Sequence, residues 1–428
     1  MKTYKYPTIE ETKELLKRPA IDSRIIQEKV FSIIKAVKTN GDKALFEFSQ
    51  KFDGVGVSKL SVDEDEFNGI ENRVDEKLKS AIDVARKNIE TFHKAQQVDS
   101  PKIEIDEGIT CWRKRVPIEK VGLYIPGGTS PLFSTLLMLG IPSNIAGCKE
   151  IIICTPPQKD GNIADSVLYV AKILGFKKIF KVGGAQAIAA MALGTGTIPK
   201  VNKIFGPGNQ WVTAAKEIVN SFGVAIDMPA GPSEVLVIAD DSANPKFVAA
   251  DLLSQAEHGV DSQVVLLSTS EQLINSVLLE IDKFKNQLSR KEIIEKSLLN
   301  SALILVGNLD EAIEISNQYA PEHLILSVKD AENFAEKIIN SGSVFLGNYS
   351  PESAGDYASG TNHTLPTNGY ASAYSGVSLD SFMKNITFQK LTQSGLQKIA
   401  PAIEAMAEAE GLDAHKLAVI VRSEEDDD

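Results

Sequence analysis

The sequence predicts an α/β fold: two Rossmann-like units, each built on a parallel sheet, with a helical N-terminal arm and a helical C-terminal tail. The first observation behind this prediction is a change of pattern at Val121, after which short β-branched runs alternate with amphipathic stretches. Strand–helix–strand repeats of this length form parallel sheets covered by helices on both faces. The second observation is that the alternation occurs twice, on either side of a link near residues 229–245.

The expected elements of both units follow from hydrophobic periodicity. In the first unit, strands are expected at 150–154, 178–182, 203–205 and 234–239, with helices at 164–174, 185–193 and 210–221. In the second unit, strands are expected at 262–267, 302–306, 323–328 and 343–346, with helices at 272–284, 309–317 and 331–339. The run Glu150-Ile-Ile-Ile-Cys154 is typical of a strand that is buried on both faces.

Helices are also expected outside these units, at 8–17, 23–40, 75–95 and 400–409. The first ends before Pro19, which cannot continue a helix, and Ser23 can cap the second. Beyond Asp380 the chain is expected to be helical up to its acidic end. We therefore expect four parts: an N-terminal helical arm (1–24), a larger α/β domain (25–121 and 236–380), a second α/β domain (122–235) and a C-terminal tail (381–428).

Composition argues against several classes of partner. With 57 acidic and 45 basic residues the net charge is −12, and nucleic-acid binding depends on a basic surface. No uncharged apolar run reaches the length of a membrane span, and the N-terminus has no apolar core of signal-peptide length. Cys111, Cys148 and Cys154 form no zinc or redox motif and are expected to be reduced thiols. We expect a cytoplasmic protein with no nucleic-acid or membrane partner.

One stretch has clear metal-binding potential, Asp251-Leu-Leu-Ser-Gln-Ala-Glu-His-Gly259. If it is helical and ends at its glycine, four polar side chains at i, i+3, i+4 and i+7 share one face. They are those of Asp251, Ser254, Gln255 and His258. Such a face either meets a partner, such as a metal ion, or lies open to solvent, and the stretch by itself leaves both readings open.

Glycine-containing loops separate several of the regular elements, at residues 122–128, 182–186, 205–210 and 229–234. In parallel α/β sheets, ligands bind where loops leave the carboxyl ends of strands. Three of these loops follow a strand and open a helix, directly or nearly so. Backbone N–H groups at the helix starts that follow would suit phosphate groups. The alternative is ordinary turn geometry, since the dinucleotide fingerprint Gly-x-Gly-x-x-Gly is absent.

Only five histidines occur, so their neighbours are informative. His93 ends a long helix and is expected at the surface. Glu322 and His323 precede a hydrophobic strand. If the backbone bends there, both can face a cleft, where the carboxylate could activate water and the imidazole could move protons. Otherwise they lie on opposite faces, one exposed and one packed. His363 shares a Gly- and Ser-rich loop with Asp356 and could bind a metal or hydrogen-bond the loop to itself.

A zinc site is possible without a cysteine pair, because zinc also accepts imidazole and carboxylate ligands. Such a set would consist of Gln255, His258, Asp356 and His415. The last of these stands alone near the C-terminus and is an ordinary surface residue unless the tail folds onto a site, its own or a neighbour's. The spacing alone does not require the set.

Taken together and in order, the motifs resemble the histidinol dehydrogenase family, the enzymes of the last steps of histidine biosynthesis. The resemblance spans about residues 20–420, and none of its motifs departs from the family pattern. It rests on residues 122–128, 183–186 (Gly-Gly-Ala-Gln), 206–209 (Gly-Pro-Gly-Asn), 230–234 (Ala-Gly-Pro-Ser-Glu), 255–259 (Gln-Ala-Glu-His-Gly), 320–324 (Ala-Pro-Glu-His-Leu), 355–367 and 410–415.

The resemblance implies an oxidation of L-histidinol to L-histidine through L-histidinaldehyde, with two NAD and two hydride transfers. It implies a homodimer with one zinc ion per subunit and shared sites, because the last zinc ligand comes from the partner subunit. The implied zinc ligands, which also contact substrate, are Gln255, His258, Asp356 and His415. The implied acid–base pair is Glu322 and His323, with Ser233 and Glu410 as further substrate contacts. The implied NAD contacts are Tyr124, Gln186 and Asn209.

By the same resemblance, residues 122–235 are the NAD-binding domain, the larger domain carries the zinc and the acid–base pair, and residues 381–428 mediate dimerisation. The main alternative is a related NAD-dependent dehydrogenase acting on another polyol, although Glu410 and His415 favour histidinol. A different class is a zinc hydrolase in which Glu322 activates water without a redox cofactor. A third is a metal-binding protein without catalytic activity.

Overall fold

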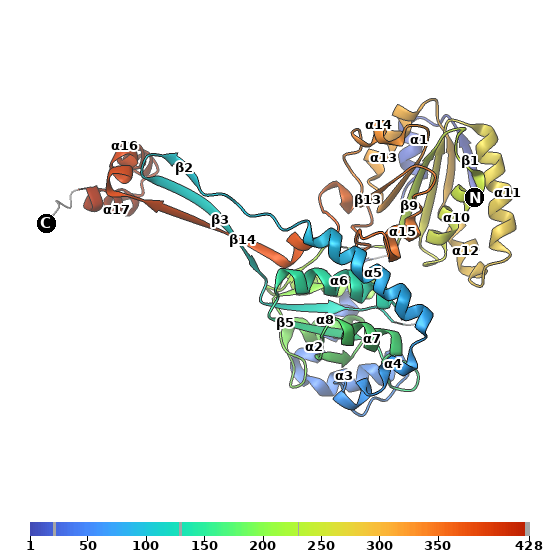
Figure 1. Ribbon diagram of the computed structural model, residues 1–428, viewed down its shortest axis with the longest axis horizontal. Coiled ribbons are helices and arrows are strands. Elements are labelled where there is room, and N and C mark those ends of the chain that lie inside the picture. The colour runs from blue at the N-terminus through green and yellow to red at the C-terminus, as the bar shows by residue number, and fades with distance from the viewer. Residues whose placement is uncertain (20–22, 128–130, 230, 424–428) are drawn as a thin grey trace.

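The computed structural model describes residues 1–19, 23–127, 131–229 and 231–423, and it confirms the expected α/β class. Two parallel-sheet units lie against each other, and a smaller third sheet extends away from both as an arm that ends in helices (Figure 1). Four features of the sequence expectations fall outside the described residues: Gly128, Ala230, the side chain of Ser23 and the acidic end at 424–428. Within the described ranges, no helix is both long and apolar enough to cross a membrane.

The larger unit contains a six-stranded sheet in which every neighbouring pair is parallel. In spatial order its strands are β1 (Lys2–Lys5), β11 (Ala302–Leu305), β10 (Gln263–Ser268), β9 (Glu234–Ala239), β12 (His323–Ser327) and β13 (Ser343–Leu346). Side chains of β9 alternate between two apolar clusters, with Val235 in one and Leu236 in the other, as the twofold period of a strand requires.

Helices cover both faces of this sheet. On one face lie α10 (Pro245–Ala256), α11 (Glu271–Lys285) and α12 (Lys291–Ser297). On the other face lie α1 (Ile9–Leu15), α13 (Leu309–Tyr319) and α14 (Ala331–Ala335). Because both faces are covered, the central strands are buried along their whole length, which explains their unbroken apolar sequences.

The second unit contains a five-stranded sheet, again wholly parallel. In spatial order its strands are β6 (Ile179–Lys181), β5 (Glu150–Thr155), β4 (Lys120–Tyr124), β7 (Lys203–Phe205) and β8 (Ala225–Ile226). One face is covered by α2 (Ser23–Asn40), α3 (Asp42–Phe48), α8 (Gly184–Leu193) and α9 (Gln210–Asn220). The other is covered by α4 (Ile70–Arg73), α5 (Glu76–Lys94), α6 (Phe133–Ala146) and α7 (Asp165–Ile173).

The expected strands are all present, each within one residue of its expected bounds. Residues 234–239, however, were expected to close the first unit, and they form β9 between β10 and β12 of the six-stranded sheet. Two N-terminal segments differ from expectation. Residues 2–5 form β1 at the edge of the six-stranded sheet rather than part of a helical arm, because parallel pairing with β11 satisfies their backbone groups. Helices α2 and α5, expected with the larger domain, pack on the five-stranded unit instead, because their apolar faces belong to its two core clusters.

His93, which was expected at the surface, is fully buried at the end of α5. Its Nδ1 lies 2.8 Å from the carbonyl oxygen of Ile89, and its Nε2 lies 3.4 Å from Asn362 Nδ2. The Asn362 amide also donates to the carbonyl oxygen of Met138 in α6, at 2.6 Å. These bonds hold the loop of residues 358–367 against two helices of the five-stranded unit.

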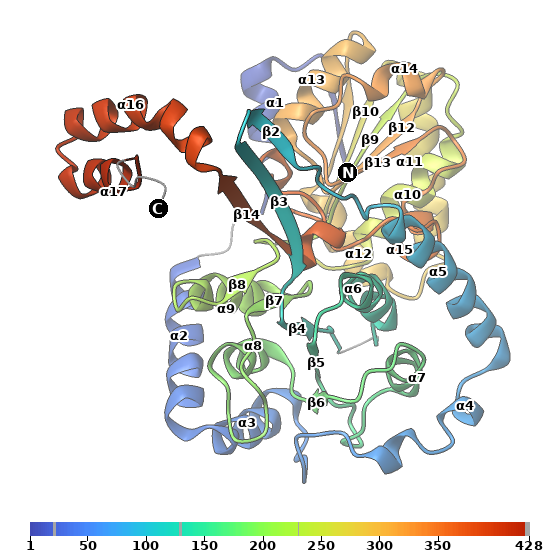
Figure 2. The ribbon, with the colours of Figure 1, turned by 60° about the vertical axis from the view of Figure 1, so that its left-hand side comes forward.

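The arm is built on an antiparallel sheet of β2 (Ile103–Asp106), β3 (Ile109–Pro117) and β14 (Met383–Leu391). The expectation that the chain is helical from Asp380 onward is therefore wrong for residues 383–391. These residues pair with β3, which suits the strand-forming run Ile386-Thr387-Phe388. Helices α16 (Gln393–Ala409) and α17 (Asp413–Ser423) follow and confirm the helical tail. Figure 2 shows this end of the chain standing clear of both α/β units.

A buried ion pair stabilises the turn that follows β7. Lys216 and Asp227 are paired, and their side chains are 3% and 0% exposed. The ammonium donates to the Gly206 carbonyl oxygen at 3.0 Å, and the carboxylate accepts the Gly206 N–H at 2.8 Å. Replacing Lys216 by methionine is expected to lower the free energy of unfolding by about 3–5 kcal/mol, since the buried carboxylate loses its partner.

Urea denaturation measures this loss. The exposed Lys200, in the same unit, offers the matched control, and its replacement by methionine is expected to change stability by less than about 0.5 kcal/mol. Equal stabilities of the Lys216 and Lys200 variants would show that the buried Lys216–Asp227 pair does not stabilise the fold.

Candidate active site

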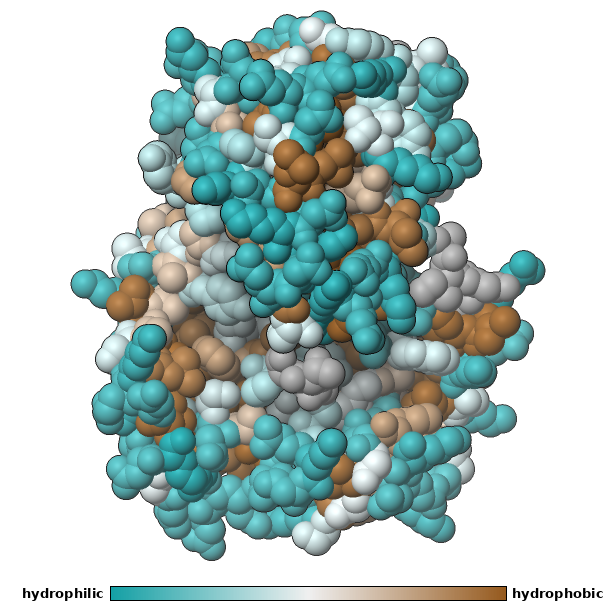
Figure 3. All heavy atoms as spheres, turned by 90° about the vertical axis from the view of Figure 1, so that its right-hand side faces the viewer, coloured by the Kyte–Doolittle hydropathy of each residue, from teal (hydrophilic) through white to brown (hydrophobic). Residues whose placement is uncertain are grey.

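A cavity of about 800 Å³ lies between the two units. Figure 3 shows the surface narrowing between the upper and lower masses of the molecule. The five-stranded unit contributes Tyr124, Gly127, Gly208 and Asn209 to the cavity wall. The six-stranded unit contributes Ser233, Gln255, His258, Glu322, His323 and Asp356. Eight of the sequence-predicted site residues therefore line one cavity: Tyr124, Asn209, Ser233, Gln255, His258, Glu322, His323 and Asp356.

The two sheets present opposite edges to this cavity. In the five-stranded sheet, Tyr124 ends β4 and the 206–209 loop follows β7, so the carboxyl edge faces inward. In the six-stranded sheet, Glu234 begins β9 and His323 begins β12, so the amino edge faces inward. In each sheet the two strands are central neighbours from which the connections run to opposite sides. The carboxyl-edge rule for ligand sites therefore describes only half of this cavity.

Glu322 and His323 both face the cavity, and both are buried, at 7% and 3% exposed. The alternative, with one exposed and one packed, is wrong. The backbone bends just before them, where Ala320 adopts a left-handed conformation with φ of 51°. Glu322 Oε2 accepts the N–H of Glu234 at 2.9 Å, and His323 Nδ1 lies 3.2 Å from the carbonyl oxygen of the same residue. The bend and these bonds aim both side chains into one space.

The cavity attracts positive charge. Burial raises the pKa of Glu322 to about 8. Burial alone would lower the pKa of His323, but the negative charges of Glu322, Glu352 and Asp356 outweigh it and raise that pKa to about 10. Three carboxylates around one imidazole thus favour a bound proton or a bound cation.

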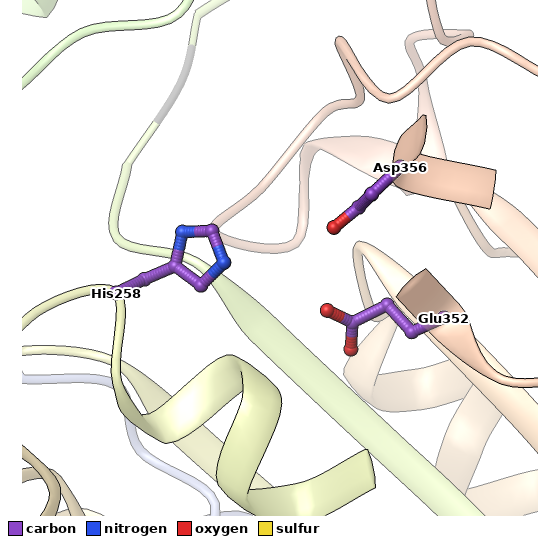
Figure 4. A group of neighbouring side chains, drawn as sticks. All are labelled: His258, Glu352 and Asp356. Atoms are coloured by element: carbon purple, nitrogen blue, oxygen red, sulfur yellow. The ribbon is translucent and has the colours of Figure 1, made fainter. Parts of the chain in front are cut away.

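A possible cation site lies beside this pair. His258, Glu352 and Asp356 each offer one ligand atom, and these atoms lie within 4.8 Å of one another. Figure 4 shows the three side chains pointing toward a common space. Glu352 and Asp356 stand four residues apart on α15 (Glu352–Tyr357), so one helix face carries both carboxylates. Within the part of the chain that the structure describes, Glu352 Oε2 is buried without a hydrogen-bond partner, as a ligand atom facing its own ion would be.

Gln255 stands at the junction of this cluster and the acid–base pair. Its Nε2 donates to the Glu234 carbonyl oxygen at 3.1 Å and to Glu322 Oε2 at 3.3 Å. Its Oε1 is buried and has no hydrogen-bond partner among the described residues, so this oxygen is available to a ligand. Helix α10 ends at Ala256 rather than at Gly259, so His258 lies just beyond the helix instead of on its predicted polar face.

Three sequence-predicted site residues do not line this cavity. Gln186 is buried in α8, where its amide lies close to Gly184. Glu410 and His415 belong to the end of the arm, which points away from both units (Figure 1). His363 is not part of the cation cluster: its Nδ1 lies 2.9 Å from the Asp356 carbonyl oxygen and its Nε2 3.2 Å from Thr135 Oγ1, so it ties its loop to α6.

Two functional candidates were missed in the sequence. Glu352 could have been found from its spacing of four residues from Asp356 in a helical stretch. Arg18 lines the cavity from the segment after α1 and pairs with Glu234. No local pattern reveals that pairing, because 216 residues separate the two.

Close packing shapes the wall on the side of the five-stranded unit. The Tyr124 hydroxyl accepts the N–H of Gly184 at 3.1 Å, at the start of α8. Gly206 has a φ of 130°, and a Cβ there would lie 2.1 Å from the Tyr124 carbonyl oxygen. Only glycine fits this position, so the chain can turn sharply from β7 toward α9.

Asn209 begins α9 as its N-cap. Its Oδ1 accepts the N–H groups of Trp211 at 3.0 Å and Val212 at 3.2 Å. Replacing Asn209 by alanine is expected to lower the free energy of unfolding by about 1 kcal/mol, because these two groups lose their acceptor. Replacement by aspartate, which also caps helices well, should preserve most of the stability in urea denaturation. An aspartate variant as unstable as the alanine variant would show that capping is not the main role.

Comparisons with known proteins agree with these features. A family model described as histidinol dehydrogenase matches residues 16–423. A histidinol dehydrogenase of Bacteroides thetaiotaomicron is 60% identical over 422 residues, which cover 99% of each chain. One from Haemophilus influenzae is 52% identical over 96% of each chain. The crystal structure of histidinol dehydrogenase from Elizabethkingia anophelis superposes with a TM-score of 0.96 at 56% identity, covering 99% of this chain and 98% of that one.

The family model covers nearly the whole chain, and both relatives are more than 50% identical to it in sequence over almost their full lengths. The resemblance drawn from the ordered motifs is confirmed, and the chain belongs to the histidinol dehydrogenase family.

Proposed function

We propose that this oxidoreductase converts L-histidinol to L-histidine through L-histidinaldehyde, using two NAD and one zinc ion per subunit. The observation that carries the proposal is the convergence, in one cavity, of a buried acid–base pair and a cation cluster with unpartnered ligand atoms. The cavity lies between two α/β units, so substrate and cofactor can enter it from different sheets. The described relatives bear the name of this activity, which supports the choice of substrate.

The proposed zinc ligands are Gln255, His258 and Asp356, together with His415 from a second copy of the chain. Their nitrogen and oxygen donors suit zinc. The unpartnered Gln255 Oε1 and the short separation of His258 and Asp356 support this set. Glu352, in the same cluster, adds negative charge that favours a divalent ion. When bound, zinc would supply a fixed point for the imidazole and amine nitrogens of histidinol.

The proposed NAD contacts are Tyr124, Gln186 and Asn209. Tyr124 and Asn209 line the cavity at the carboxyl edge of the five-stranded sheet, where nucleotides bind in folds of this kind. The starts of α8 and α9 lie beside them and offer backbone N–H groups. We accordingly assign residues 122–235 to the cofactor-binding side of the molecule as far as they belong to the five-stranded unit, since residues 234 and 235 begin β9 of the six-stranded sheet. Ser233 and Glu410 are proposed substrate contacts, the latter from the second copy.

The hydrogen bonds of His323 define its role. His323 Nδ1 lies 3.0 Å from Gln255 Nε2 and 3.2 Å from the Glu234 carbonyl oxygen, and the same Gln255 nitrogen also donates to that carbonyl and to Glu322. Its other nitrogen, Nε2, lies 3.5 Å from Asp356 Oδ1 and has no hydrogen-bond partner among the described residues. Nε2 can accept a proton once the imidazole is neutral, and the raised pKa of His323 places that form at alkaline pH. In the first oxidation, Nε2 takes the hydroxyl proton while hydride leaves the carbinol carbon for the nicotinamide.

Glu322 serves the second oxidation in this proposal. The aldehyde must be hydrated before it can lose another hydride, and a carboxylate beside it can deprotonate the attacking water. The hydrate then transfers hydride to a second NAD and leaves the carboxylate of histidine. The Glu234 N–H holds one oxygen of Glu322, which keeps the carboxylate beside His323 throughout.

A second copy of the chain is proposed because Glu410 and His415, at the end of α16 and in α17, lie on the arm, away from the cavity of their own chain. The arm exposes large apolar side chains that suit an interface, among them Ile103, Ile386, Met406 and Leu417. We propose that residues 381–428, with β2 and β3, mediate a homodimer with shared sites. We further propose a cytoplasmic location, in keeping with a biosynthetic role.

Absorbance of NADH tests the function. Protein incubated with zinc, NAD and L-histidinol is expected to form two NADH for each histidine. Oxidation of another polyol, with no response to histidinol, would favour a related dehydrogenase. Turnover that needs no NAD would instead indicate a zinc hydrolase, and zinc binding without any turnover a protein that only binds metal.

A further inference from the structure

Arg18 reaches the cavity from the segment between α1 and α2 and pairs with Glu234. Its Nε and Nη2 bond the two carboxylate oxygens, the second at 2.9 Å. Nη2 also donates to the Tyr319 carbonyl oxygen at 2.7 Å, and the guanidinium carbon lies 3.9 Å from the centre of the Tyr319 ring. The Glu234 side chain is only 2% exposed. A two-point bond in so buried a place fixes the geometry of both partners.

The main chain of Glu234 is where the proposed catalytic and metal-binding residues meet. Its N–H donates to Glu322, while its carbonyl oxygen accepts from Gln255 and contacts His323 Nδ1. These three side chains come from β12, its preceding turn and α10. Any rotation of the Glu234 peptide groups would therefore turn the acid–base pair and the free Gln255 oxygen together.

Glu234 lies at the very start of a strand. It is the first residue of β9, paired in register with Gln263 of β10, and a loop rather than a strand precedes it. Its side chain adds a further restraint, since Arg18 holds both carboxylate oxygens and the Asn368 N–H donates to Oε1 at 2.9 Å. The N-terminal segment thus reaches the reacting groups through one ion pair.

We infer that Arg18 is a positioning residue: through the Glu234 carboxylate it sets the placement of Glu322, His323 and the metal-binding oxygen of Gln255. This inference rests on the proposed function of those three residues. Arg18 itself bonds Glu234 and not these three side chains. Groups that orient metal ligands in this way typically change metal affinity by about 10–100-fold when they are lost.

The alternative is that Arg18 merely anchors the N-terminal segment. Gln263 supplies the matched control, because its Nε2 donates to the Lys17 carbonyl oxygen at 3.2 Å and its Oε1 accepts from the Tyr319 hydroxyl at 2.8 Å. It holds the same segment, but its side chain has no bond to the Glu234 carboxylate among the described contacts. A Gln263→Leu variant should be less stable than the wild type yet keep its zinc affinity and kcat.

The experiment compares full-length Arg18→Met, Arg18→Lys and Gln263→Leu with the wild type. Zinc affinity is measured by competition with a chelator, and kcat and KM are measured for histidinol and NAD. Arg18→Met is expected to weaken zinc binding by about 10–100-fold and to lower kcat, with little change in the KM for NAD. Arg18→Lys should recover stability better than kcat, since an ammonium cannot bond both carboxylate oxygens in the same fork.

A double-variant cycle adds a readout that anchoring alone would not change. On a Glu322→Gln background, Arg18→Met should cost much less in aldehyde oxidation than it does alone, because its effect passes through Glu322. A folded Arg18→Met protein with wild-type zinc affinity and kcat would overturn the inference. If that variant does not fold, the same result for Arg18→Lys would overturn it. A wild-type protein that neither binds zinc nor oxidises histidinol would refute the proposed function instead.

Discussion

Replacing Glu322 by glutamine is expected to slow the oxidation of histidinaldehyde by about 100–10,000-fold, the usual contribution of a general base. Glutamine has nearly the same shape, and its carbonyl oxygen can still accept the Glu234 N–H, so the fold around the site should persist. What it loses is the ability to take a proton from water. Oxidation of histidinol to the aldehyde depends on His323 and should fall much less.

The two half-reactions are separated by supplying either histidinol or histidinaldehyde with NAD and following the formation of NADH. Glu314, an exposed glutamate on α13, offers the control, and its change to glutamine should leave both rates unchanged. If both half-reactions fall equally in the Glu322→Gln protein, water activation does not belong to Glu322.

Mixing two inactive variants, His258→Asn and His415→Asn, is expected to restore about a quarter of the wild-type activity. Each proposed site combines His258 of one chain with His415 of the other, so a mixed dimer holds one intact site and one doubly altered site. Random exchange makes about half of the dimers mixed, and a twofold interface gives each of them a single working site. His415 lies in α17 on the arm, away from the cavity of its own chain, which is why a second copy is proposed to supply it.

The measurement combines subunit exchange of the two proteins with the NADH assay. Each variant should also hold less zinc than the wild type, because each lacks one ligand. A mixture of His415→Asn with Glu322→Gln should likewise recover activity, since Glu322 lies on the same chain as His258. Mixtures no more active than their separate components, under conditions where subunits exchange, would place both histidines outside a shared site.

The two parallel sheets could be predicted from the sequence because strands covered on both faces need unbroken apolar runs, as in Glu150–Thr155. The same reasoning fails for strands without such cover. β1 is the polar edge sequence Lys-Thr-Tyr-Lys, and β14 is mostly exposed on the arm. Their pairing partners, β11 and β3, are hundreds of residues away in the chain, so nothing local marks them as strands.

For the site, the ordered motifs identified the side chains, but their spacing could not reveal how two sheets face each other. The amino edge at His323 and the carboxyl edge at Tyr124 meet only because of the packing of the units. Arg18 escaped notice for a related reason. Its importance depends on Glu234, and that partnership exists only after the six-stranded unit has formed.

The pairing of β1 with β11 has a consequence for how the protein is made on the ribosome. Lys2 is made long before its partner Ala302, which is synthesised 300 residues later. At about 5–20 residues per second, the first strand waits roughly 15–60 seconds for its place in the sheet. Meanwhile residues 23–228 contain every strand of the five-stranded sheet and can fold during synthesis. The five-stranded unit can therefore form before β1 has a partner, and the wait is a window in which chaperones could hold the unpaired strand.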